Sequence, residues 1–305
     1  MPANGYTYTM HLAFGERALS AILRWLPIKH GKHRILDKFF PKPWIERSQP
    51  VVVSIRGFDV VVDPNDLVGW HLVILRSFDP EVVEVLSKSC EMNEHEVFWD
   101  IGANKGACFC NLATQLPSLR IVAIEPQAAL AEINTINLET ICRGRYEYVC
   151  AGISDMEGEL TLTIPESNQG AASLHINQCR PGDKKEVIKL LTAETIKAQS
   201  KYGWPNIIKI DVEGHEKQVF KSLEPCLSSG VCKTIVFENH AWESNAFENI
   251  KMILRKHGYE IYGIEKTPWR TRLRRTDKLL PRTTDYAAIH KDQIRKQTRL
   301  ARLIA

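Results

Sequence analysis

Residues 97–106 read VFWDIGANKG, an apolar run that ends on Asp100 and then turns through Gly102, Asn104 and Gly106. A glycine turn between a strand and a helix presents backbone N–H groups and the positive end of the helix, which usually suit phosphate. A carboxylate at the mouth of the turn repels a pyrophosphate but attracts the sulfonium or ammonium group of S-adenosylmethionine (SAM). The spacing also departs from the dinucleotide fingerprint, because three residues separate Gly102 from Gly106 and Asn104 takes the middle position. The segment favours a SAM site over an NAD site, although a glycine turn by itself also occurs as a plain connection without a ligand.

Four more acids follow later predicted strands, namely Glu125, Asp155, Asp211 and Glu238. Ligands of an open parallel sheet bind beyond the carboxyl ends of its strands, so we expect these acids and Asp100 to surround one ligand. Glu125 follows the glycine turn by about 25 residues, where a carboxylate can accept both hydroxyls of a ribose. An NAD enzyme places an acid similarly. Glu125 therefore indicates a nucleoside cofactor, and Asp100 favours SAM.

The elements that must position these acids alternate in type along the chain. From residue 97 onward, short apolar segments recur with helical patterns between them, which is typical of βαβ units and a mostly parallel sheet. We predict strands at 97–101, 120–124, 146–150, 207–211, 233–237, 259–264 and 286–290, and helices at 106–116, 127–138, 184–198, 214–223 and 243–257. The alternating segment GELTLTIPES at 158–167 indicates an extra strand or hairpin. One α/β domain is the simplest interpretation.

The N-terminal part has its own pattern. Residues 11–26 carry apolar positions at helical spacing and end before Pro27, which predicts a helix packed on the main domain. Residues 51–63 read VVVSIRGFDVVVD, as expected for a strand pair that turns at Gly57. Residues 79–90 have an acidic start and a helical apolar pattern, so they predict an amphipathic helix before the first core strand.

The amino-acid composition indicates the broad class of protein. The chain has 305 residues, of which 44% are hydrophobic and 25% charged, as in soluble globular proteins. Its apolar stretches fall short of the roughly 20 residues that a membrane span needs. The start MPANGYTYTMH lacks the pattern of a signal peptide, so we predict a cytoplasmic protein without a membrane span. The eight cysteines are scattered without zinc-type spacing, which predicts free thiols.

Positive charge is concentrated in the C-terminal segment. Residues 266–305 hold twelve Lys or Arg against three Asp or Glu, whereas the whole chain has a formal charge of only +4. Such a segment can engage nucleic acid or an anionic membrane surface. The commoner interpretation is a solvated face of a terminal helix.

Six motifs together resemble the FkbM family of SAM-dependent methyltransferases. They are DIGANKG at 100–106, IEP at 124–126, GISDMEG at 152–158, NQGAASL at 168–174, IKIDVEGHE at 208–216 and VFENH at 236–240. The resemblance covers about residues 75–265 and implies a Rossmann-like class I methyltransferase fold, with a mostly parallel seven-stranded sheet flanked by helices and a last strand that runs antiparallel. It implies O-methylation of hydroxyls on sugars, lipids, polyketides or other small metabolites. On this basis we divide the chain into an N-terminal helical and strand extension (1–70), a methyltransferase core (71–265) and a basic C-terminal segment with the last strand (266–305).

The resemblance also implies roles for single residues. Asp100, Gly102, Asn104 and Gly106 would hold the methionine end of SAM and shape the turn, and Glu125 would bind the ribose. Ser154 and Asp155 would lie near the adenine. Asp211 would face the amino-acid part of SAM or the methyl group in transfer. Residues 168–174 would form a loop over the acceptor.

Methyl transfer to an alcohol is an in-line displacement in which the hydroxyl must also lose its proton. His215 and His240 are the candidate bases, because each follows an acid-bearing strand end and histidine titrates near neutrality. Each could instead be a structural hydrogen-bonding residue. We expect no metal, but Asp211, Glu213, Glu238 and Asn239 offer oxygen ligands that could hold Mg²⁺. Trp204, Trp242 and Phe247 could line the acceptor site, although such aromatics are more often part of a core.

These observations favour a SAM-dependent O-methyltransferase that acts on a small metabolite, sugar or lipid-linked acceptor. The main alternative is a nucleic-acid-binding protein whose basic tail contacts phosphates while the fold serves as a scaffold. An NAD-dependent enzyme is a third possibility, which Asp100 disfavours. No segment predicts an oligomeric state.

Overall fold

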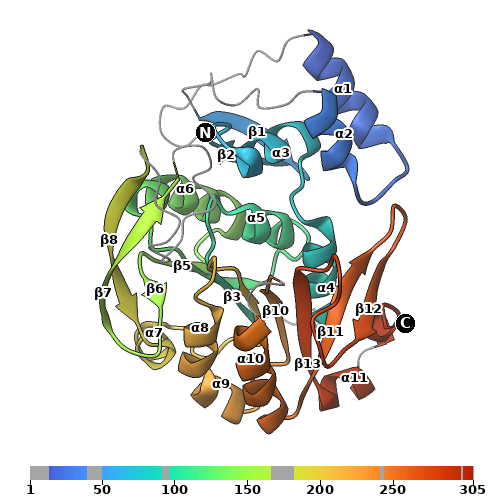
Figure 1. Cartoon of the computed structure of the whole chain (residues 1–305). Helices are drawn as coiled ribbons and strands as arrows, with labels where there is room; N and C mark the ends of the chain where they lie inside the picture. Colours follow the sequence, from blue (N-terminus) through green and yellow to red (C-terminus); the bar gives the residue numbers. More distant parts are fainter. Residues whose placement is uncertain are drawn as a thin grey trace.

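The computed structural model describes residues 14–39, 50–90, 96–165, 182–240, 244–296 and 298–304. Its centre is a sheet with helices on both faces (Figure 1). The sheet has eight strands in the order β12-β11-β13-β10-β9-β3-β4-β5. Their bounds are β3 (Val97–Ile101), β4 (Arg120–Ile124), β5 (Tyr146–Val149), β9 (Ile207–Ile210), β10 (Thr234–Glu238), β11 (Tyr259–Lys266), β12 (Thr271–Arg275) and β13 (Asp285–His290).

Strand directions confirm the predicted α/β class. The strands from β10 through β9, β3 and β4 to β5 are all parallel to their neighbours. Strand β13 lies antiparallel between β10 and β11, which matches the antiparallel last strand implied by the family resemblance. All seven predicted strands are present.

An eighth strand, β12, lies at one edge of the sheet and was not predicted. It reads TRLRR, with Thr271 and Leu273 buried and the arginines exposed. Charged side chains protect the edge of a sheet from pairing with other chains. The same arginines made this segment look like part of a solvated basic tail, so the strand was missed.

The strand order reverses beside β3. The chain adds β4 and β5 on one side of β3 and then returns to its other side with β9 and β10. The carboxyl ends of β3 and β9 therefore border a crevice, the usual ligand position in such a sheet. Asp100 lies near the end of β3, and Asp211 directly follows β9.

Two hydrophobic cores cover the two faces of the sheet. Phe98 of β3 packs in the core that includes Phe109, and its neighbour Trp99 packs in the core that includes Phe220. Successive side chains of a strand point to opposite faces, so β3 serves both cores. Helices α4 (Pro80–Ser89), α5 (Ala107–Ala113) and α6 (Ala131–Cys142) belong to the first core, and α7 (Ala193–Gln199), α8 (Glu216–Ser222), α9 (Glu224–Ser228) and α10 (Ser244–Lys256) belong to the second. A short 3-10 helix, Ala128–Leu130, precedes α6.

A separate three-stranded sheet stands beside the main one. It has the order β6-β8-β7, with β6 (Gly152–Ile153), β7 (Gly158–Ile164) and β8 (Lys184–Leu191). Strand β7 confirms the extra strand predicted at 158–167. The helix predicted at 184–198 is wrong in its first half, because residues 184–191 pair with β7 and only α7 is helical. This pairing and the burial of Ile188 and Leu190 outweigh the helical preference of a lysine-rich segment.

The N-terminal elements share the first core. They are α1 (Phe14–Trp25), α2 (Lys32–Phe39), β1 (Val51–Ile55), β2 (Phe58–Val62) and α3 (Leu67–Leu75). The predicted helix and the hairpin turning at Gly57 are confirmed, whereas α2 and α3 were not predicted. The Asn137 side chain of α6 bonds both the N–H and the carbonyl of Val61, at 2.7 and 2.8 Å. The boundary predicted at residue 70 falls inside α3.

The C-terminal segment is also built into the fold. It supplies β12 and β13, followed by α11 (Lys291–Lys296) and α12 (Thr298–Ala301). Leu300 and Leu303 are buried, and the N–H of Leu273 donates to the carbonyl of Leu303 at 2.7 Å. The segment is therefore more than a solvated helix face. No helix among the residues that the structure describes is long and apolar enough to cross a bilayer.

A buried charge cluster joins the two ends of the chain to α4. The Glu81 carboxylate lies 3.2 Å from His30 Nδ1 and also pairs with Lys266. The Glu81 side chain is only 3% exposed. Burial alone would raise the pKa of Glu81, but the hydrogen bond with His30 and the charge of Lys266 lower it from 4.5 to about 2.

We expect this cluster to make stability depend on acid pH. Because the pKa of Glu81 is depressed in the folded state, its contribution is complete above about pH 4.5 and is lost as the pH falls toward about 2. Its size is roughly 3 kcal/mol. Urea unfolding of the wild type and Glu81→Gln should therefore differ most near neutral pH and converge in acid. Glu159→Gln, at an exposed position on β7, is the matched control. A pH-independent difference between wild type and Glu81→Gln would contradict the assignment.

Candidate functional site

The glycine turn after β3 has the tight geometry that its residues predict. Gly102, Asn104 and Gly106 all have positive φ angles, of 74°, 49° and 76°. A Cβ on Gly102 would lie 1.8 Å from the Asp211 carbonyl oxygen, so this turn and the end of β9 approach too closely for any side chain. The Asn134 side chain donates to the Asn104 carbonyl at 2.7 Å and fixes the middle of the turn.

Asp100 lies beneath the turn, not at its mouth. Its side chain is fully buried, and its Oδ2 accepts from the N–H of Phe109 at 3.1 Å, in the first turns of α5. Burial raises the pKa of Asp100 to about 6, and the nearby ammonium of Lys209 opposes that rise. The described walls of the cavities below do not include Asp100. The predicted position of its carboxylate is therefore wrong, because side chains alternate along β3 and that of Asp100 points toward α5.

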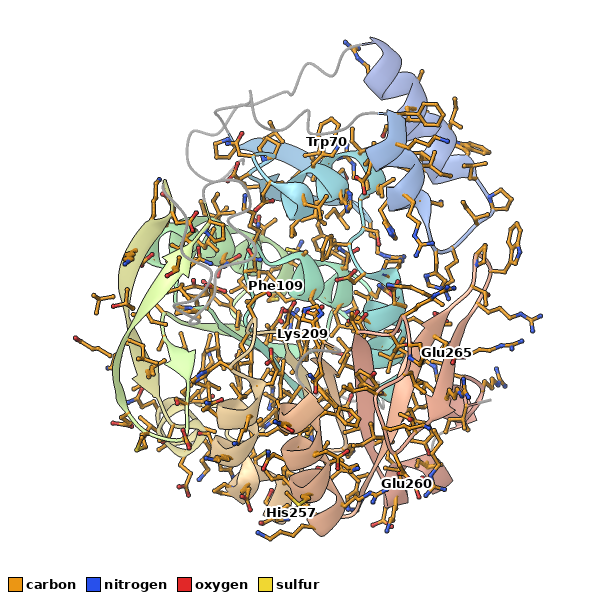
Figure 2. The ribbon with its side chains drawn as sticks, viewed as in Figure 1. Trp70, Phe109, Lys209, His257, Glu260 and Glu265 are labelled. Carbon is orange, nitrogen blue, oxygen red and sulfur yellow. The ribbon has the colours of Figure 1, made fainter. Side chains whose placement is uncertain are left out.

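Lys209 is the central residue that the sequence analysis missed. Its Nζ lies 3.0 Å from Asp211 Oδ2, 3.1 Å from the Gly102 carbonyl oxygen and 3.8 Å from Asp100 Oδ1. Burial alone would lower the pKa of Lys209, but the charges of Asp211 and Asp100 raise it above its usual value. Figure 2 shows Lys209 in the middle of the molecule. One feature of the sequence could have indicated the role of Lys209. This lysine lies inside the apolar run of β9, and a buried ammonium group needs anionic partners.

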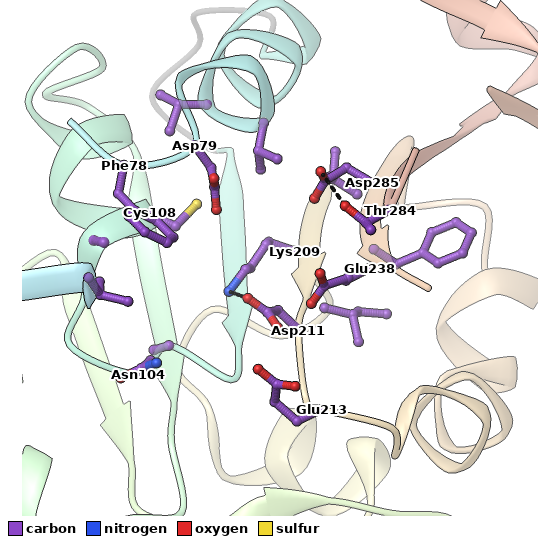
Figure 3. Close-up of a pocket in the computed structure, with 18 of the residues that line it drawn as sticks. Phe78, Asp79, Asn104, Cys108, Lys209, Asp211, Glu213, Glu238, Thr284 and Asp285 are labelled. Atoms are coloured by element: carbon purple, nitrogen blue, oxygen red, sulfur yellow. Dashed lines mark hydrogen bonds and ion pairs between the residues drawn. The ribbon is translucent and has the colours of Figure 1, made fainter. Parts of the chain in front are cut away.

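Two cavities open at the carboxyl ends of the parallel strands. The first lies among the turn, the end of β4 and the three-stranded sheet; its walls include Gly102, Glu125, Pro126, Ile153, Leu190 and His215. The second has a volume of about 280 Å³ and lies among α4, the turn and the ends of β9, β10 and β13 (Figure 3). Both cavities are lined by Asn104, Asp211 and Glu213. One ligand can therefore reach from the first cavity to the edge of the second.

Glu125 is held in the first cavity by the backbone. Its two oxygens accept from the N–H groups of Asn104 and Gln127, at 2.8 and 2.9 Å. Burial raises its pKa, while these two hydrogen bonds lower it. A carboxylate has about four acceptor positions, so each oxygen can still accept from a hydroxyl. This geometry suits the predicted contact with a ribose.

Ser154, Asp155 and His215 form a chain of polar contacts beside the first cavity. His215 Nε2 lies 3.1 Å from Ser154 Oγ, and Asp155 pairs with Lys221 at 3.1 Å. Among these three residues, only His215 belongs to the described wall of the first cavity, and the second cavity includes none of them. The structure thus places His215 in the wall of the first cavity, together with Glu125, Asp211 and Glu213, and outside the described wall of the second cavity.

The second cavity brings several acids together. Oxygen atoms of Asp211, Glu213 and Glu238 lie within 4.8 Å of one another. Burial and the charge of Asp211 raise the pKa of Glu238 to about 10. Burial also raises the pKa values of Asp79 and Asp285, which line the same cavity. An entering cation would relieve this repulsion and favour the ionised carboxylates.

His240 lies behind Glu238. Its Nε2 is 3.5 Å from Glu238 Oε1, but the described wall of the cavity holds Glu238 and not His240. The side chain of Asn239 is turned the other way, with its Nδ2 donating to the His240 carbonyl at 3.3 Å. The structure therefore places a carboxylate, with a histidine next to it, where sequence analysis expected the histidine itself.

The other predicted residues do not join this site. Trp204 packs against Trp99 with ring centroids 5.9 Å apart, and Phe247 packs on Tyr286 in the second core. Phe247 is therefore a core residue, and Trp204 is partly buried against the same core. Trp242 and the acceptor loop predicted at 168–174 lie outside the described residues.

Comparison with known proteins identifies the family of this chain. The family model described as "Methyltransferase FkbM domain" matches residues 100–261. A hexuronic acid methyltransferase, AglP, from Haloferax volcanii is 28% identical over 199 residues, covering 63% of this chain and 75% of that protein.

Solved structures of methyltransferases are also similar. A SAM-dependent methyltransferase from Agrobacterium tumefaciens has 12% identity and a TM-score of 0.43, covering 82% of this chain and 72% of that one. An O-methyltransferase from Bacillus cereus, solved in complex with SAH, has 13% identity and a TM-score of 0.36, covering 68% of this chain and 79% of that one.

The family match spans more than half of the chain, from Asp100 in β3 to Ile261 in β11. It contains the glycine turn, Glu125 and the acids at the ends of β9 and β10. The chain belongs to the FkbM family of SAM-dependent methyltransferases.

Proposed function

We propose that this methyltransferase transfers the methyl group of SAM to a hydroxyl of a small metabolite, sugar or lipid-linked acceptor held in the second cavity. The observation that carries the proposal is the wall of Asn104, Asp211 and Glu213 that both cavities share. A cofactor whose nucleoside lies in the first cavity would present its reactive group at this wall. The acceptor would approach the same wall from the second cavity.

The residues of the first cavity fit the nucleoside of SAM. Glu125 offers acceptor positions to the two ribose hydroxyls, and apolar side chains such as Ile153 and Leu190 line the remaining wall. The backbone of Gly102 and the Asp211 carboxylate stand where the methionine part would lie. Bound SAM supplies an electrophilic methyl group on a sulfonium centre.

Residues of the second cavity would prepare the acceptor. The Glu238 carboxylate takes the hydroxyl proton, and His240 stands next to it as a positioning residue that can share that proton. Asp211, held by Lys209, orients the reacting groups. General base catalysis of this kind contributes roughly 10² to 10⁴ in rate.

The ribose contact of Glu125 can be tested directly. Glu125→Gln is expected to weaken SAM binding roughly 10- to 100-fold, because it removes a charged acceptor of two hydroxyls. Isothermal titration calorimetry measures the change. Asp155→Asn is the comparison, and we expect less than about a threefold effect because Asp155 lies beside the cavity, not on its wall. Equal losses in both variants would contradict this assignment.

The raised pKa of Glu238 predicts that SAM binding is linked to proton release. With a pKa of about 10, Glu238 is protonated near neutral pH, and a cation entering beside it favours the ionised form. SAM affinity should therefore rise with pH, by up to about tenfold per unit. Calorimetry in buffers of different ionisation enthalpy measures the protons released. Glu238→Gln should release fewer protons than the wild type, and an unchanged release would exclude Glu238 as their source.

Kinetic measurements of acceptor methylation can distinguish the role of Glu238 from that of His240. With an acceptor identified by screening for methylated products, Glu238→Gln should lower kcat roughly 10²- to 10⁴-fold. His240→Ala should lower it less and shift the pH profile of kcat, while SAM affinity stays within about threefold of wild type. Full activity of Glu238→Gln would remove it from the mechanism. If a chelator abolishes the activity of the wild type and Mg²⁺ restores it, the result would instead indicate that Asp211, Glu213 and Glu238 bind a metal ion.

A further inference from the structure

Two segments from opposite ends of the chain meet on a surface that the proposed reaction does not use. They are helix α1 with the connection to α2, and the turn between β11 and β12. The N–H groups of Lys29 and His30 both donate to the Pro268 carbonyl, at 2.6 and 3.3 Å. In Figure 1 the connection between α1 and α2 reaches down to the tip of the β11–β12 hairpin. We call this region the α1–hairpin surface.

Helix α1 has an apolar stripe on its outer face. Ala18, Ala21, Ile22 and Trp25 follow the spacing i, i+3, i+4 and i+7, so they lie on one side of the helix. All four are exposed, Ile22 to 58% and Trp25 to 88%. Leu23, on the opposite side, is fully buried in the core. A helix at the surface of a soluble protein usually turns a polar face outward, so this outer stripe calls for an explanation.

The hairpin tip adds a second exposed tryptophan. Trp269 follows Pro268 directly and is 61% exposed. The hydrogen bonds to Pro268 bring this turn against the connection that follows α1. Ile22 and Trp25 on α1 and Trp269 on the hairpin tip are therefore large exposed apolar side chains on two elements that meet through the connection after α1, in contrast to single exposed residues, which need no explanation.

Basic residues surround these apolar side chains. Residues 14–39 contain six Lys or Arg against two Asp or Glu, and residues 266–275 contain five Lys or Arg and no acid. Part of this charge is neutralised by ion pairs, because Lys29, Lys266, Arg274 and Arg275 pair with Glu84, Glu81, Glu265 and Glu260. Arg24, Arg270 and Arg272 are exposed beside the apolar residues. The surface thus combines tryptophan, aliphatic and basic side chains.

We propose that the α1–hairpin surface binds an anionic lipid membrane. Tryptophan favours the headgroup level of a bilayer, an aliphatic side chain such as Ile22 can enter the acyl boundary, and arginine attracts lipid phosphates. The positive charge of both segments complements an anionic leaflet. A helix that lies in the plane of the interface needs an apolar face and basic flanks, as α1 has.

The apolar stripe distinguishes a membrane from nucleic acid as the partner. A nucleic acid would need only the arginines of this surface to bind its phosphates, and only the aromatic rings to stack on its bases. Ala18, Ala21 and Ile22 contribute to neither, whereas an acyl boundary accommodates all three.

The surface belongs to the same structural unit as one wall of the second cavity. Ser20 Oγ of α1 donates to the Ile74 carbonyl of α3 at 2.8 Å, and Leu67 and Val68 of α3 line that cavity. Membrane binding would therefore bring this wall near the lipid surface. The inference stands independently of the proposed acceptor, because it rests on exposed residues outside both cavities.

The test is co-sedimentation of the full chain with vesicles of phosphatidylcholine, alone or mixed with phosphatidylglycerol. We expect at least about tenfold stronger partitioning onto the anionic vesicles, decreasing as salt is raised. Trp25→Ser and Ile22→Ser should each lower that partitioning about tenfold. Arg24→Gln and Arg272→Gln should each lower it about fivefold.

Matched controls lie on the three-stranded sheet. Val187 is 65% exposed on β8, so Val187→Ser removes a comparable apolar side chain elsewhere, and Lys185→Gln removes an exposed charge. Both should partition like the wild type. Unchanged SAM affinity in every variant would show that the fold and the cofactor site are intact.

Three results would overturn the inference. They are equal partitioning onto neutral and anionic vesicles, no effect of Trp25→Ser and Ile22→Ser, and tighter binding to a single-stranded RNA probe than to the anionic vesicles. None of them bears on SAM binding, so failure here is distinct from failure of the proposed function.

Discussion

The buried ion pairs of Lys209 hold the site together. The ammonium group lies near the carboxyl ends of the paired strands β3 and β9 and contacts Asp100, Asp211 and the Gly102 carbonyl. A buried cation is costly without such partners, so the turn and both strands must keep the positions that supply them. Close packing adds a second constraint, because Gly102 approaches the Asp211 backbone too closely for a side chain. The crevice at the switch point therefore has one geometry, on which both cavities depend.

A cationic cofactor would stabilise the ionised forms of the acids that line the second cavity. Lys209 and Lys266 offset part of their charge, and burial with mutual repulsion raises the pKa values of Asp79, Glu238 and Asp285. The cavity can hold these groups together because some of them stay protonated. Under the proposed function, a sulfonium or ammonium group would replace protons as the compensating charge. Asp100 contributes indirectly, by capping α5 and pairing with Lys209 beneath the turn.

The described N-terminal helices and the C-terminal segment are both structural parts of the enzyme. His30 and Lys266 meet on Glu81, and Thr271 Oγ1 lies 3.0 Å from His30 Nε2. These contacts attach the first helices and the edge of the main sheet to α4, which lines the second cavity. The basic C-terminal segment likewise holds β13 inside the sheet, between β10 and β11. Several basic side chains of this segment lie on the outer strand β12, where they protect the edge of the sheet and add positive charge to the α1–hairpin surface.

The sequence by itself determined the α/β class, all seven predicted strands and the glycine turn after β3, because these depend on local periodicity and glycine positions. It also indicated Glu125 and the acids at the ends of β9 and β10. Only the tertiary structure decided that residues 184–191 form a strand, that Asp100 points inward, and that Glu238 faces the cavity with His240 behind it. The contacts of Lys209, and those between the α1–α2 connection and the hairpin tip, also depend on partners remote in the sequence. Pairing partners, side-chain direction and burial are properties of the assembled fold, and no local pattern of residues encodes them.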